Sequence, residues 1–324
     1  MIQSAKYPTV SLALGGGGAR GLAHLGVIEE LQRMPVSIDR FVGVSIGSLA
    51  GALCAFDSNT TRVSKNVLTY LTSDKFQTKQ AALFAAAPDA EEPVTAGLFA
   101  WFHQIRKFVG ARRRLSAIFR RSALLDAEII QDIVDSLVPD IDIRDLKTPL
   151  SIVALDLLSG KRVVLTEGSL RSAVMASAAI PGVFPPVKWG SMLLCDIGTM
   201  DAIPSKVAKT YSSDLTIAVD VGARIEPVSH CSTAAEIFLR LSDIGEPLVR
   251  DYTSQIADLV VRPTVASTSW YDFSDPAALI QHGRHALVSL GTSWLYGRDC
   301  HLPAHQPRIV DVSDSGDQLT RASS

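Results

Sequence analysis

The chain has 324 residues, enough for one large domain or two small ones with a sizeable core. Hydrophobic residues make up 47% and charged residues 20%, and the formal net charge of −2 gives no electrostatic basis for binding nucleic acid. Four cysteines without a Cys-x-x-Cys pair argue against a zinc ribbon or a disulfide scaffold, and no signal-peptide pattern or apolar run of roughly 18 residues occurs. We therefore expect a cytoplasmic protein whose contact with a membrane is at most peripheral.

The first predicted elements form a β-α-β unit. Residues 9–14 are an apolar strand, residues 22–35 repeat apolar side chains at helical spacing, and residues 40–44 form a second strand. Because such units are right-handed, the two strands should be parallel, with their carboxyl ends at one edge of the sheet. The glycine-rich loop at 15–21 and the Gly-Val-Ser-Ile-Gly sequence at 43–47 should therefore meet at that edge.

The second of these motifs indicates a nucleophile elbow. Ser45 stands between Gly43 and Gly47 where a strand runs directly into a helix-favouring sequence. The turn is too sharp for side chains at the two glycines, and it leaves the serine hydroxyl clear of the backbone. The adjoining helix start supplies unpaired N–H groups and a positive dipole end that favour an oxyanion.

The glycine-rich loop also matches a dinucleotide-binding fingerprint, with glycines at 16, 18 and 21. A Rossmann enzyme is therefore an alternative, and a purely structural tight turn is another. The Rossmann alternative needs an acid at the end of the second strand, where Ser45 stands instead, and we place Asp39 before that strand. Loops of this kind bind any anion, including the oxyanion of an acyl transfer.

Residues 57–126 differ from their surroundings and predict a helical, lid-like insertion. Within it, the sequence 101–121 predicts an amphipathic helix, although Gly110 interrupts it. It is either an ordinary surface helix or a lid that rests on an anionic lipid surface. Its basic face is formed by Arg106, Lys107, Arg113, Arg114, Arg120 and Arg121, and the cluster 112–114 is the expected lipid contact.

The remaining chain returns to alternating strands and helices. Beyond residue 306 the composition turns polar, so we expect one domain over 1–306 and a disordered tail over 307–324. Strands are predicted at 150–155, 161–166, 192–195, 215–221 and 256–261, and helices at 171–179 and 228–255.

A serine nucleophile needs a base, and the sequence offers two kinds. His282 or His285 would complete a conventional triad, but neither follows a convincing strand. Asp196 closes the strand 192–195 and precedes a small, flexible turn. Such an aspartate is commonly a plain turn carboxylate or a helix cap, so this alternative stays open.

Four motifs in order resemble those of patatin-like phospholipases, over roughly residues 9–221. They are Gly-Gly-Gly-Gly-Ala-Arg-Gly at 15–21, Gly-Val-Ser-Ile-Gly at 43–47, an Arg-x4-Ala-Ser-x3-Pro-Gly-x-Phe-x-Pro block at 171–186, and Asp-Ile-Gly at 196–198. The likeness is strongest to bacterial members and to the catalytic domain of neuropathy target esterase. It implies a three-layer α/β/α fold with a mostly parallel central sheet.

The resemblance also implies roles for individual residues. Ser45 would be the nucleophile and Asp196 its only base, without a histidine, a metal or a cofactor. The oxyanion hole would use backbone N–H groups of Gly17 and Gly18, with Arg20 nearby, and the loop that forms it comprises Gly16, Gly17, Gly18, Ala19, Arg20 and Gly21.

The family usually has glycine where Ile197 stands before Gly198. If that position required a positive φ, a β-branched residue would be strained there and turnover would suffer. The expected function is hydrolysis of a lipid ester through an acyl-enzyme, by a phospholipase, lysophospholipase or esterase. A lipid-binding or regulatory protein with weak turnover is the alternative, and the sequence leaves the oligomeric state open.

Overall fold

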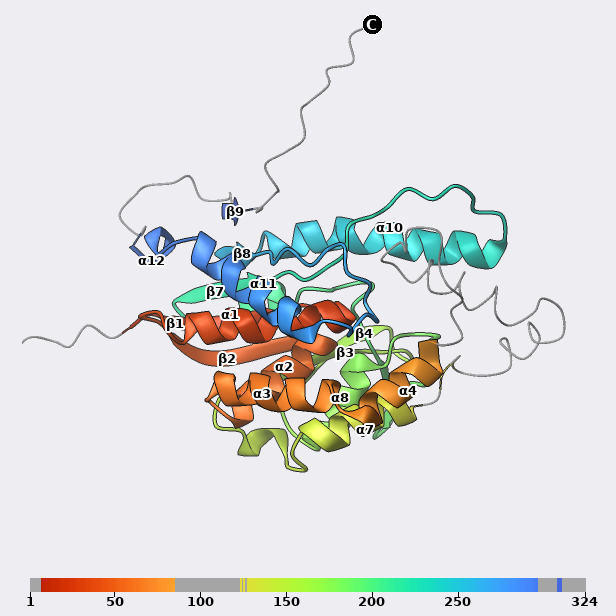
Figure 1. The fold of residues 1–324 in the computed structure, drawn as a ribbon, viewed down its shortest axis with the longest axis horizontal. Coiled ribbons are helices and arrows are strands. Elements are labelled where there is room, and N and C mark those ends of the chain that lie inside the picture. Colours follow the sequence, from red (N-terminus) through yellow and green to blue (C-terminus); the bar gives the residue numbers. More distant parts are fainter. Residues whose placement is uncertain (1–6, 85–122, 124, 126, 297–307, 311–324) are drawn as a thin grey trace, which may run out of the picture.

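The protein is built on one mixed, mostly parallel β-sheet. The computed structural model describes residues 7–84, 123, 125, 127–296 and 308–310 (Figure 1). The strand order is β5-β6-β3-β2-β1-β7-β8-β9, and β4 pairs with β3 outside this path. The strands are β1 (Thr9–Leu14), β2 (Ser37–Val44), β3 (Leu150–Asp156), β4 (Lys161–Leu165), β5 (Val187–Trp189), β6 (Met192–Cys195), β7 (Leu215–Val219), β8 (Leu259–Val261) and β9 (Arg308–Val310).

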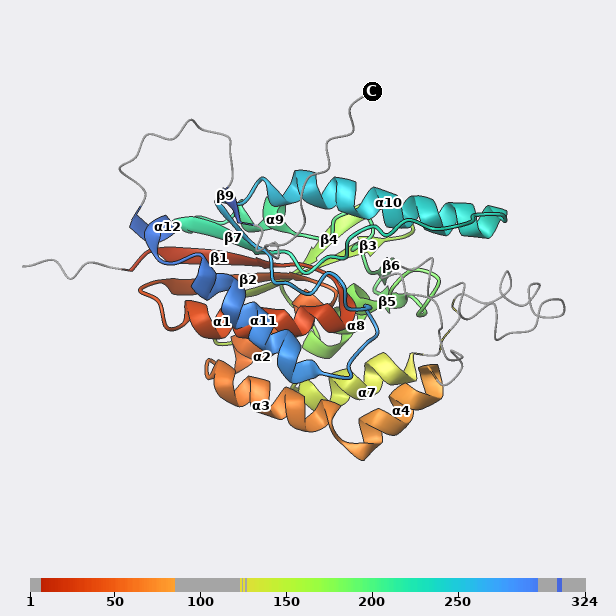
Figure 2. The same cartoon turned by 45° about the horizontal axis from the view of Figure 1, so that its top comes forward.

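Helices cover both faces of this sheet, which confirms the predicted three-layer α/β/α fold. One face carries α1, α2, α8 and α11, with α3, α4 and α7 outside them, and the other carries α9 and α10 (Figure 2). The helices are α1 (Ala23–Leu31), α2 (Ile46–Phe56), α3 (Thr60–Leu71), α4 (Asp74–Phe84), α7 (Glu128–Leu137), α8 (Leu170–Ala178), α9 (Ser205–Ala208), α10 (Ala234–Ser254), α11 (Pro276–Ser289) and α12 (Ser293–Tyr296), with short 3-10 turns at Gly18–Leu22 and Ile143–Asp145.

The central strands β1, β2 and β3 are mainly apolar in the parts of their length where both faces are buried. In β1, Val10, Leu12 and Leu14 point to one core cluster and Ala13 to the other. The strand β1 pairs in parallel with β2 and β7, so the predicted β-α-β unit is present and the carboxyl ends of β1 and β2 share one edge.

Several predicted boundaries shift. The strand β2 begins at Ser37, so Asp39 lies inside it and not before it, and its side chain accepts a hydrogen bond from Ser213 at 2.9 Å. Part of the expected insertion is core, because α3 buries Val63 and Val67 in the main cluster. The predicted basic helix at 101–121 lies outside the described residues.

The expectation of a disordered tail over 307–324 needs a correction at its start. Residues Arg308–Val310 form β9, which pairs in parallel with β8 and extends the sheet by one strand. A three-residue segment can satisfy its backbone by pairing at a sheet edge even when the surrounding composition is polar. In the described part of the chain, no helix has both the length and the low polarity needed to cross a bilayer.

Candidate active site

The backbone at Ser45 is strained in the way that a nucleophile elbow requires. Ser45 has φ 54° and ψ −126°, and it is the one non-glycine residue with positive φ among the described residues. Such a conformation costs on the order of 1–3 kcal/mol and persists only where the surroundings enforce it. The hydroxyl therefore stands at the carboxyl end of β2, directly before α2.

The neighbouring residues enforce this turn through close packing and hydrogen bonds. A Cβ on Gly47 would lie 2.2 Å from the carbonyl oxygen of Leu14, and one on Gly43 would lie 2.5 Å from that of Gly47. The Ser45 N–H donates to Ser177 Oγ at 2.9 Å, and the Ser177 hydroxyl donates to the Val153 carbonyl at 2.7 Å. The elbow is thus held by α8 and β3 together.

Asp196 lies beside Ser45. The strand β6 runs antiparallel to β3, and its end carries Asp196 to the same edge of the sheet. The Asp196 carboxylate is 5% exposed and accepts the Gly198 N–H at 2.7 Å. Burial raises its pKa to about 6, although hydrogen bonds from the Ser45 hydroxyl and the Gly198 N–H act in the lowering direction. At neutral pH this carboxylate is ionised and close to the pKa that suits a general base.

The backbone of Ile197 is not strained, although this residue stands where the family usually has glycine. Its φ is negative, and its side chain is buried in the core cluster that contains Val42, Val44 and Ile203. The turn closes through hydrogen bonds from the Met200 and Asp201 N–H groups to the Ile197 carbonyl. A β-branched residue is therefore compatible with this turn.

The glycine-rich loop faces Ser45, but not all of its N–H groups are available. The Gly16 N–H donates to the Ala202 carbonyl at 2.9 Å and the Ala19 N–H to the Trp270 carbonyl at 2.6 Å, so neither can serve an oxyanion. Between them, Gly18 has φ 59°, and a Cβ there would lie 2.1 Å from the Trp270 carbonyl oxygen. Of the loop residues proposed from the sequence, Gly17 and Gly18 remain as the candidate donors.

Arg20 and Gly21 shape the loop and do not reach Ser45 as donors. The Arg20 guanidinium donates to the carbonyls of Val221 at 2.9 Å and Thr268 at 3.0 Å. Burial lowers its pKa to about 10, so it remains charged at neutral pH. Gly21 packs against Ile46, where a Cβ would clash with the isoleucine side chain.

No histidine of the described residues lies at this site. His24 is fully buried, its Nε2 is 2.8 Å from the Gly15 carbonyl, and burial lowers its pKa to about 4. It therefore supports the glycine loop as a neutral side chain. His282 and His285 lie on α11, away from the residues that line the cavities around Ser45. The histidine-triad alternative is not supported.

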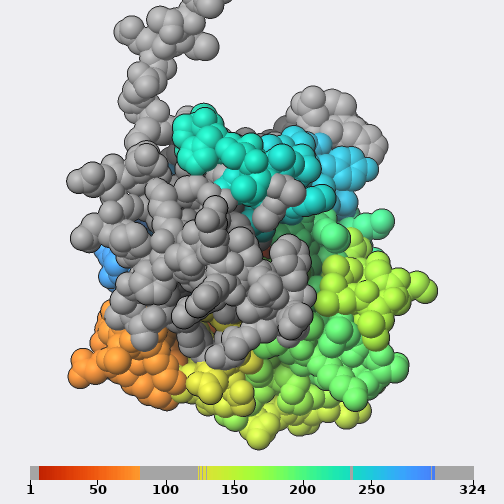
Figure 3. Space-filling model, turned by 90° about the vertical axis from the view of Figure 1, so that its right-hand side faces the viewer, coloured from red at the N-terminus to blue at the C-terminus, as the bar shows by residue number. Residues whose placement is uncertain are grey.

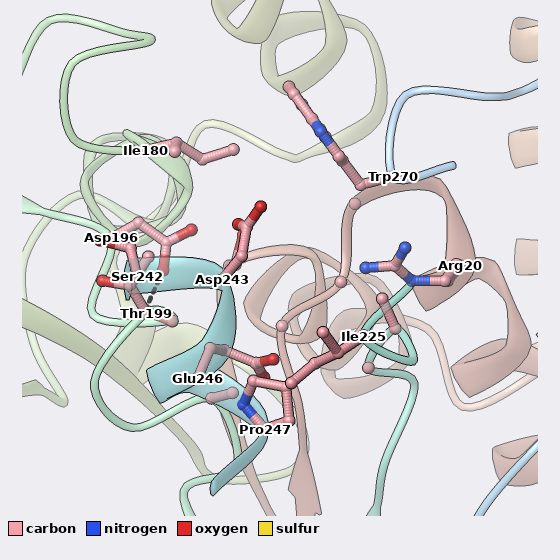
Figure 4. A pocket seen from close by; sticks show the side chains of 18 of the residues that line it. Arg20, Ile180, Asp196, Thr199, Ile225, Ser242, Asp243, Glu246, Pro247 and Trp270 are labelled. Carbon is pink, nitrogen blue, oxygen red and sulfur yellow. Dashed lines mark hydrogen bonds between the residues drawn. The ribbon is translucent and has the colours of Figure 1, made fainter. Parts of the chain in front are cut away.

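Two cavities meet at Ser45, and the first, the polar cavity, is lined by charged side chains. Asp196 lies at one side of it and Arg20 at the other, with Asp243 and Glu246 of α10 between them (Figure 4). Burial raises the pKa of Glu246 to about 7, while the charge of Arg250 opposes that rise. Arg250 also reaches Asp220 at 3.4 Å, so a buried charge cluster backs this wall.

The second, the apolar cavity, extends from Ser45 between α3, α4 and α7. It shares Gly18, Ser45, Ile180 and Trp270 with the polar cavity. Its lining is almost entirely aliphatic and aromatic, with Phe76 packed edge-on against Phe273 at 5.5 Å between ring centroids. Further lining residues are Leu49, Val67, Tyr70, Ile130, Ile133, Leu137 and Phe184.

The arrangement does not fit the dinucleotide alternative. The end of β2 carries Ser45 where a Rossmann site needs an acid, and Asp39 lies inside β2, hydrogen-bonded to Ser213. Among the described residues, no group of three histidine, cysteine, aspartate or glutamate side chains is placed to hold a metal ion.

Three contributors to the site were missed by sequence reasoning. Ser177 belongs to a recognised motif block, but nothing in the sequence shows that it binds the Ser45 N–H. Trp270 and Glu246 lie 225 and 201 residues after Ser45 in segments without a motif, and only the fold brings them to the cavities.

The sequence of this chain is similar to those of two known proteins. An uncharacterized NTE family protein of Mycobacterium tuberculosis is 32% identical over 223 residues, which are 68% of this chain and 51% of that protein. Patatin-like phospholipase domain-containing protein 6 of Homo sapiens is 30% identical over 221 residues, or 67% of this chain and 14% of that protein. This chain thus spans about half of the length of the first relative and about one seventh of the second.

A solved structure and a family profile complete the comparison. The crystal structure of VipD from Legionella pneumophila matches 88% of this chain and 66% of its own, with a TM-score of 0.43 and 12% identity. The profile of patatin-like phospholipases matches residues 12–209, which include the glycine loop, Ser45 and Asp196. This chain therefore belongs to the patatin-like phospholipase family.

Proposed function

We propose that this protein is a serine lipid acyl hydrolase that uses Ser45 and Asp196 as a catalytic dyad. The observation that carries the proposal is that the strained Ser45 and the buried Asp196 line the same cavity, where the Ser45 hydroxyl favours the ionised form of a carboxylate whose pKa is about 6. A serine hydroxyl becomes an effective nucleophile when a base within hydrogen-bond reach accepts its proton. In this proposal Asp196 is that base, and no histidine takes part.

The reaction follows two steps of acyl transfer. Asp196 accepts the Ser45 proton as Oγ attacks the ester carbonyl, and the N–H groups of Gly17 and Gly18 stabilise the oxyanion. The tetrahedral intermediate then collapses, and the departing alcohol takes the proton from Asp196. Water attacks the acyl-enzyme with Asp196 as base, which releases the fatty acid and restores Ser45. Loss of one oxyanion donor typically lowers turnover by about 10²–10³.

The two cavities support a lipid ester as the substrate. The apolar cavity suits the acyl chain, because its wall is formed by side chains such as Phe76 and Ile133. The polar cavity suits the alcohol portion, since Asp243, Glu246 and Arg20 face it. The scissile carbonyl would then lie at Ser45, where the cavities meet. The family relationship independently favours a lipid ester.

A lipid-binding protein with weak turnover is less well supported. The reason to consider it was strain at Ile197, and that residue has an ordinary negative φ.

The proposal is tested with Ser45→Ala and Asp196→Asn. Each variant should lower kcat/KM for a short-chain aryl ester by at least about 10³, because each removes one member of the dyad. Asp145→Asn, an exposed carboxylate on the Ile143–Asp145 turn, is the matched control and should keep full activity. A panel of phospholipids and lysophospholipids, followed by mass spectrometry, then identifies the preferred ester. Turnover near that of the native protein in either dyad variant would contradict the proposal.

A further inference from the structure

The helix α10 is amphipathic, but its polar face lines a cavity and its apolar face is exposed. A surface helix of a globular protein normally buries its apolar face and exposes its polar one. In α10, the side chains that line the polar cavity are Arg240, Ser242, Asp243, Glu246 and Pro247, so a mainly polar face points toward the active site. Figure 2 shows α10 along the outside of the molecule, on the opposite side of the sheet from α3 and α4.

The other face of α10 is apolar and open to solvent. Its large side chains fall within an arc of about 120° on a helical wheel, at i, i+1, i+4 and related spacings. The exposed fractions reach 72% for Phe238, 66% for Leu248 and 75% for Tyr252, whereas scattered surface apolar residues are usually single. We call this surface the α10 apolar face; it consists of Ile237, Phe238, Leu241, Leu248, Val249 and Tyr252.

We infer that the α10 apolar face docks on a lipid surface and brings the polar cavity to it. This inference rests on the proposed function, since it assumes that the substrate is drawn from a lipid phase. The same helix would then contribute to membrane docking and to substrate entry. Its outer face would enter the lipid–water interface, and its inner face would border the path to Ser45.

The composition of the face fits an acyl phase better than a protein partner. From Ile237 to Tyr252 the arc holds no Asp, Glu, Lys or Arg, and it extends for roughly 22 Å along the helix axis. Contact with acyl chains needs no hydrogen-bond partners and no matching charge, which fits a face without a charged residue. Of the two aromatic residues near its ends, Phe238 and Tyr252, the tyrosine suits the boundary between head groups and chains.

The position of the face relative to the active site supports the same occupant. The helix α10 lies along the upper border of the molecular face drawn in Figure 3. Asp243 and Glu246, one turn apart on the inner side, line the cavity that also contains Ser45 and Asp196. A lipid surface against the outer side of this helix is therefore close to the entrance of the catalytic cavity.

The test compares the double variant Phe238→Ser/Leu241→Ser with a matched control, Tyr7→Ser/Val288→Ser. The control also removes one exposed aromatic and one exposed aliphatic side chain, which are 61% and 57% exposed. Tyr7 precedes β1, and Val288 lies near the end of α11, so neither belongs to α10. Thermal melting of both variants checks that the substitutions leave the fold intact.

The first readout is flotation of the full chain with unilamellar phosphatidylcholine vesicles. The native protein and the control should bind, and the α10 variant should lose at least about tenfold in vesicle partitioning. The second readout is hydrolysis of a soluble short-chain ester. All three proteins should hydrolyse it at the same rate, because the exposed face does not touch Ser45.

Several outcomes would overturn the inference. One is equal vesicle binding by the α10 variant and the native protein, and another is no binding by the native protein. A native dimer that the α10 variant converts to a monomer, without a change in vesicle binding, would assign the face to a second copy. A lower melting temperature with unchanged binding would mean that another part of the chain covers it.

The two proposals can fail separately. If native protein binds vesicles through the α10 apolar face but leaves the soluble ester intact, docking stands and the hydrolase proposal fails. If the soluble ester is hydrolysed and the α10 variant binds vesicles normally, the hydrolase proposal stands and docking fails.

Discussion

At the scale of single residues, the catalytic proposal depends on a carboxylate whose environment opposes its charge. Asp196 is buried, and its pKa of about 6 is well above the ordinary value near 3.8. Only its hydrogen bonds with Ser45 and Gly198 favour the ionised form. A base of this kind is poised for proton transfer, and its environment makes the folded protein pH-sensitive.

We expect the activity to follow the titration of Asp196. Because the ionised carboxylate is the base, kcat/KM for a soluble ester should fall about tenfold per pH unit below about pH 6 and level off above it. Glu246, with a pKa of about 7, is the competing titrating group in the same cavity. In Glu246→Gln the inflection of the kcat/KM–pH curve should stay near pH 6. If the inflection disappears in that variant, the group that controls activity is Glu246 and not Asp196.

Asp196→Asn should also be more stable than the native protein above pH 6. An acid whose folded pKa is raised loses stability as pH rises from its unfolded pKa, near 3.8, through the folded value near 6. Asparagine carries no charge, so the melting temperature should increase by roughly 2–6 °C at pH 8. The gain should vanish near pH 4, and Asp145→Asn is the control. An Asp196→Asn variant that melts below the native protein at pH 8 would contradict this cost of burial.

The sequence predicts the nucleophile and base but not their supports. Ser45 and Asp196 are identifiable because short motifs mark the ends of strands. Ser177 and Trp270 act through a side-chain oxygen and a backbone carbonyl, which leave no residue-type signal. Backbone conformation is also hidden: the family pattern raised the prospect of strain at Ile197, whereas the structure has a negative φ there.

At the scale of elements, the helices α3, α4 and α7 contribute side chains both to the hydrophobic core and to the wall of the apolar cavity. Val63 and Val67 of α3 are both buried in the core, and Val67 also lines the apolar cavity together with Tyr70 of the same helix. Tyr70 donates to Asp132 of α7 at 2.9 Å, and Lys75 and Lys79 of α4 pair with the same carboxylate. One acidic side chain thus ties the three helices together at the cavity wall.

Filling the apolar cavity should shorten the preferred acyl chain. Ile133 lines it from α7 and is partly buried, so Ile133→Trp adds bulk inside the cavity. We expect kcat/KM for long-chain esters to fall at least about tenfold, with little change for a butyrate ester, because only long chains reach α7. Ile133→Val is the matched control and should keep the native chain-length profile. An equal loss for short and long esters would show that this cavity does not receive the chain.

The positions of the apolar strands can be predicted from the sequence, whereas the orientation of the helices is harder to predict. Most predicted strands are present, because buried parallel strands form continuous apolar runs. The sequence does not show which face of α10 is exposed to solvent, because that depends on how the helix packs against the rest of the fold. An apolar stripe on a helix normally indicates the buried side, and here it indicates the exposed one.

At the scale of the whole molecule, several strands of the sheet separate β2, which leads into Ser45, from the terminal strand β9. The order β2-β1-β7-β8-β9 places two strands between β2 and β8, and β9 lies beyond β8. Ser45 therefore lies far from the segment that we expected to be a tail.

Truncation tests how much β9 contributes. A chain that ends at residue 306 loses the pairing of β9 with β8, so it should melt roughly 2–5 °C lower while its kcat/KM for a soluble ester stays within about twofold. A chain that ends at residue 312 keeps β9 and serves as the control. Equal melting temperatures for the two truncations would show that β9 adds no stability.

The central claim is that Ser45 is a nucleophile activated by Asp196, and covalent labelling tests it most directly. The native protein, Asp196→Asn and Ser45→Ala are incubated with a fluorophosphonate, and the modified peptide is identified by mass spectrometry. We predict a single adduct on Ser45, formed at least about 10³ times more slowly in Asp196→Asn and absent from Ser45→Ala. An adduct on another residue, or labelling of Ser45 at the native rate in Asp196→Asn, would contradict the account.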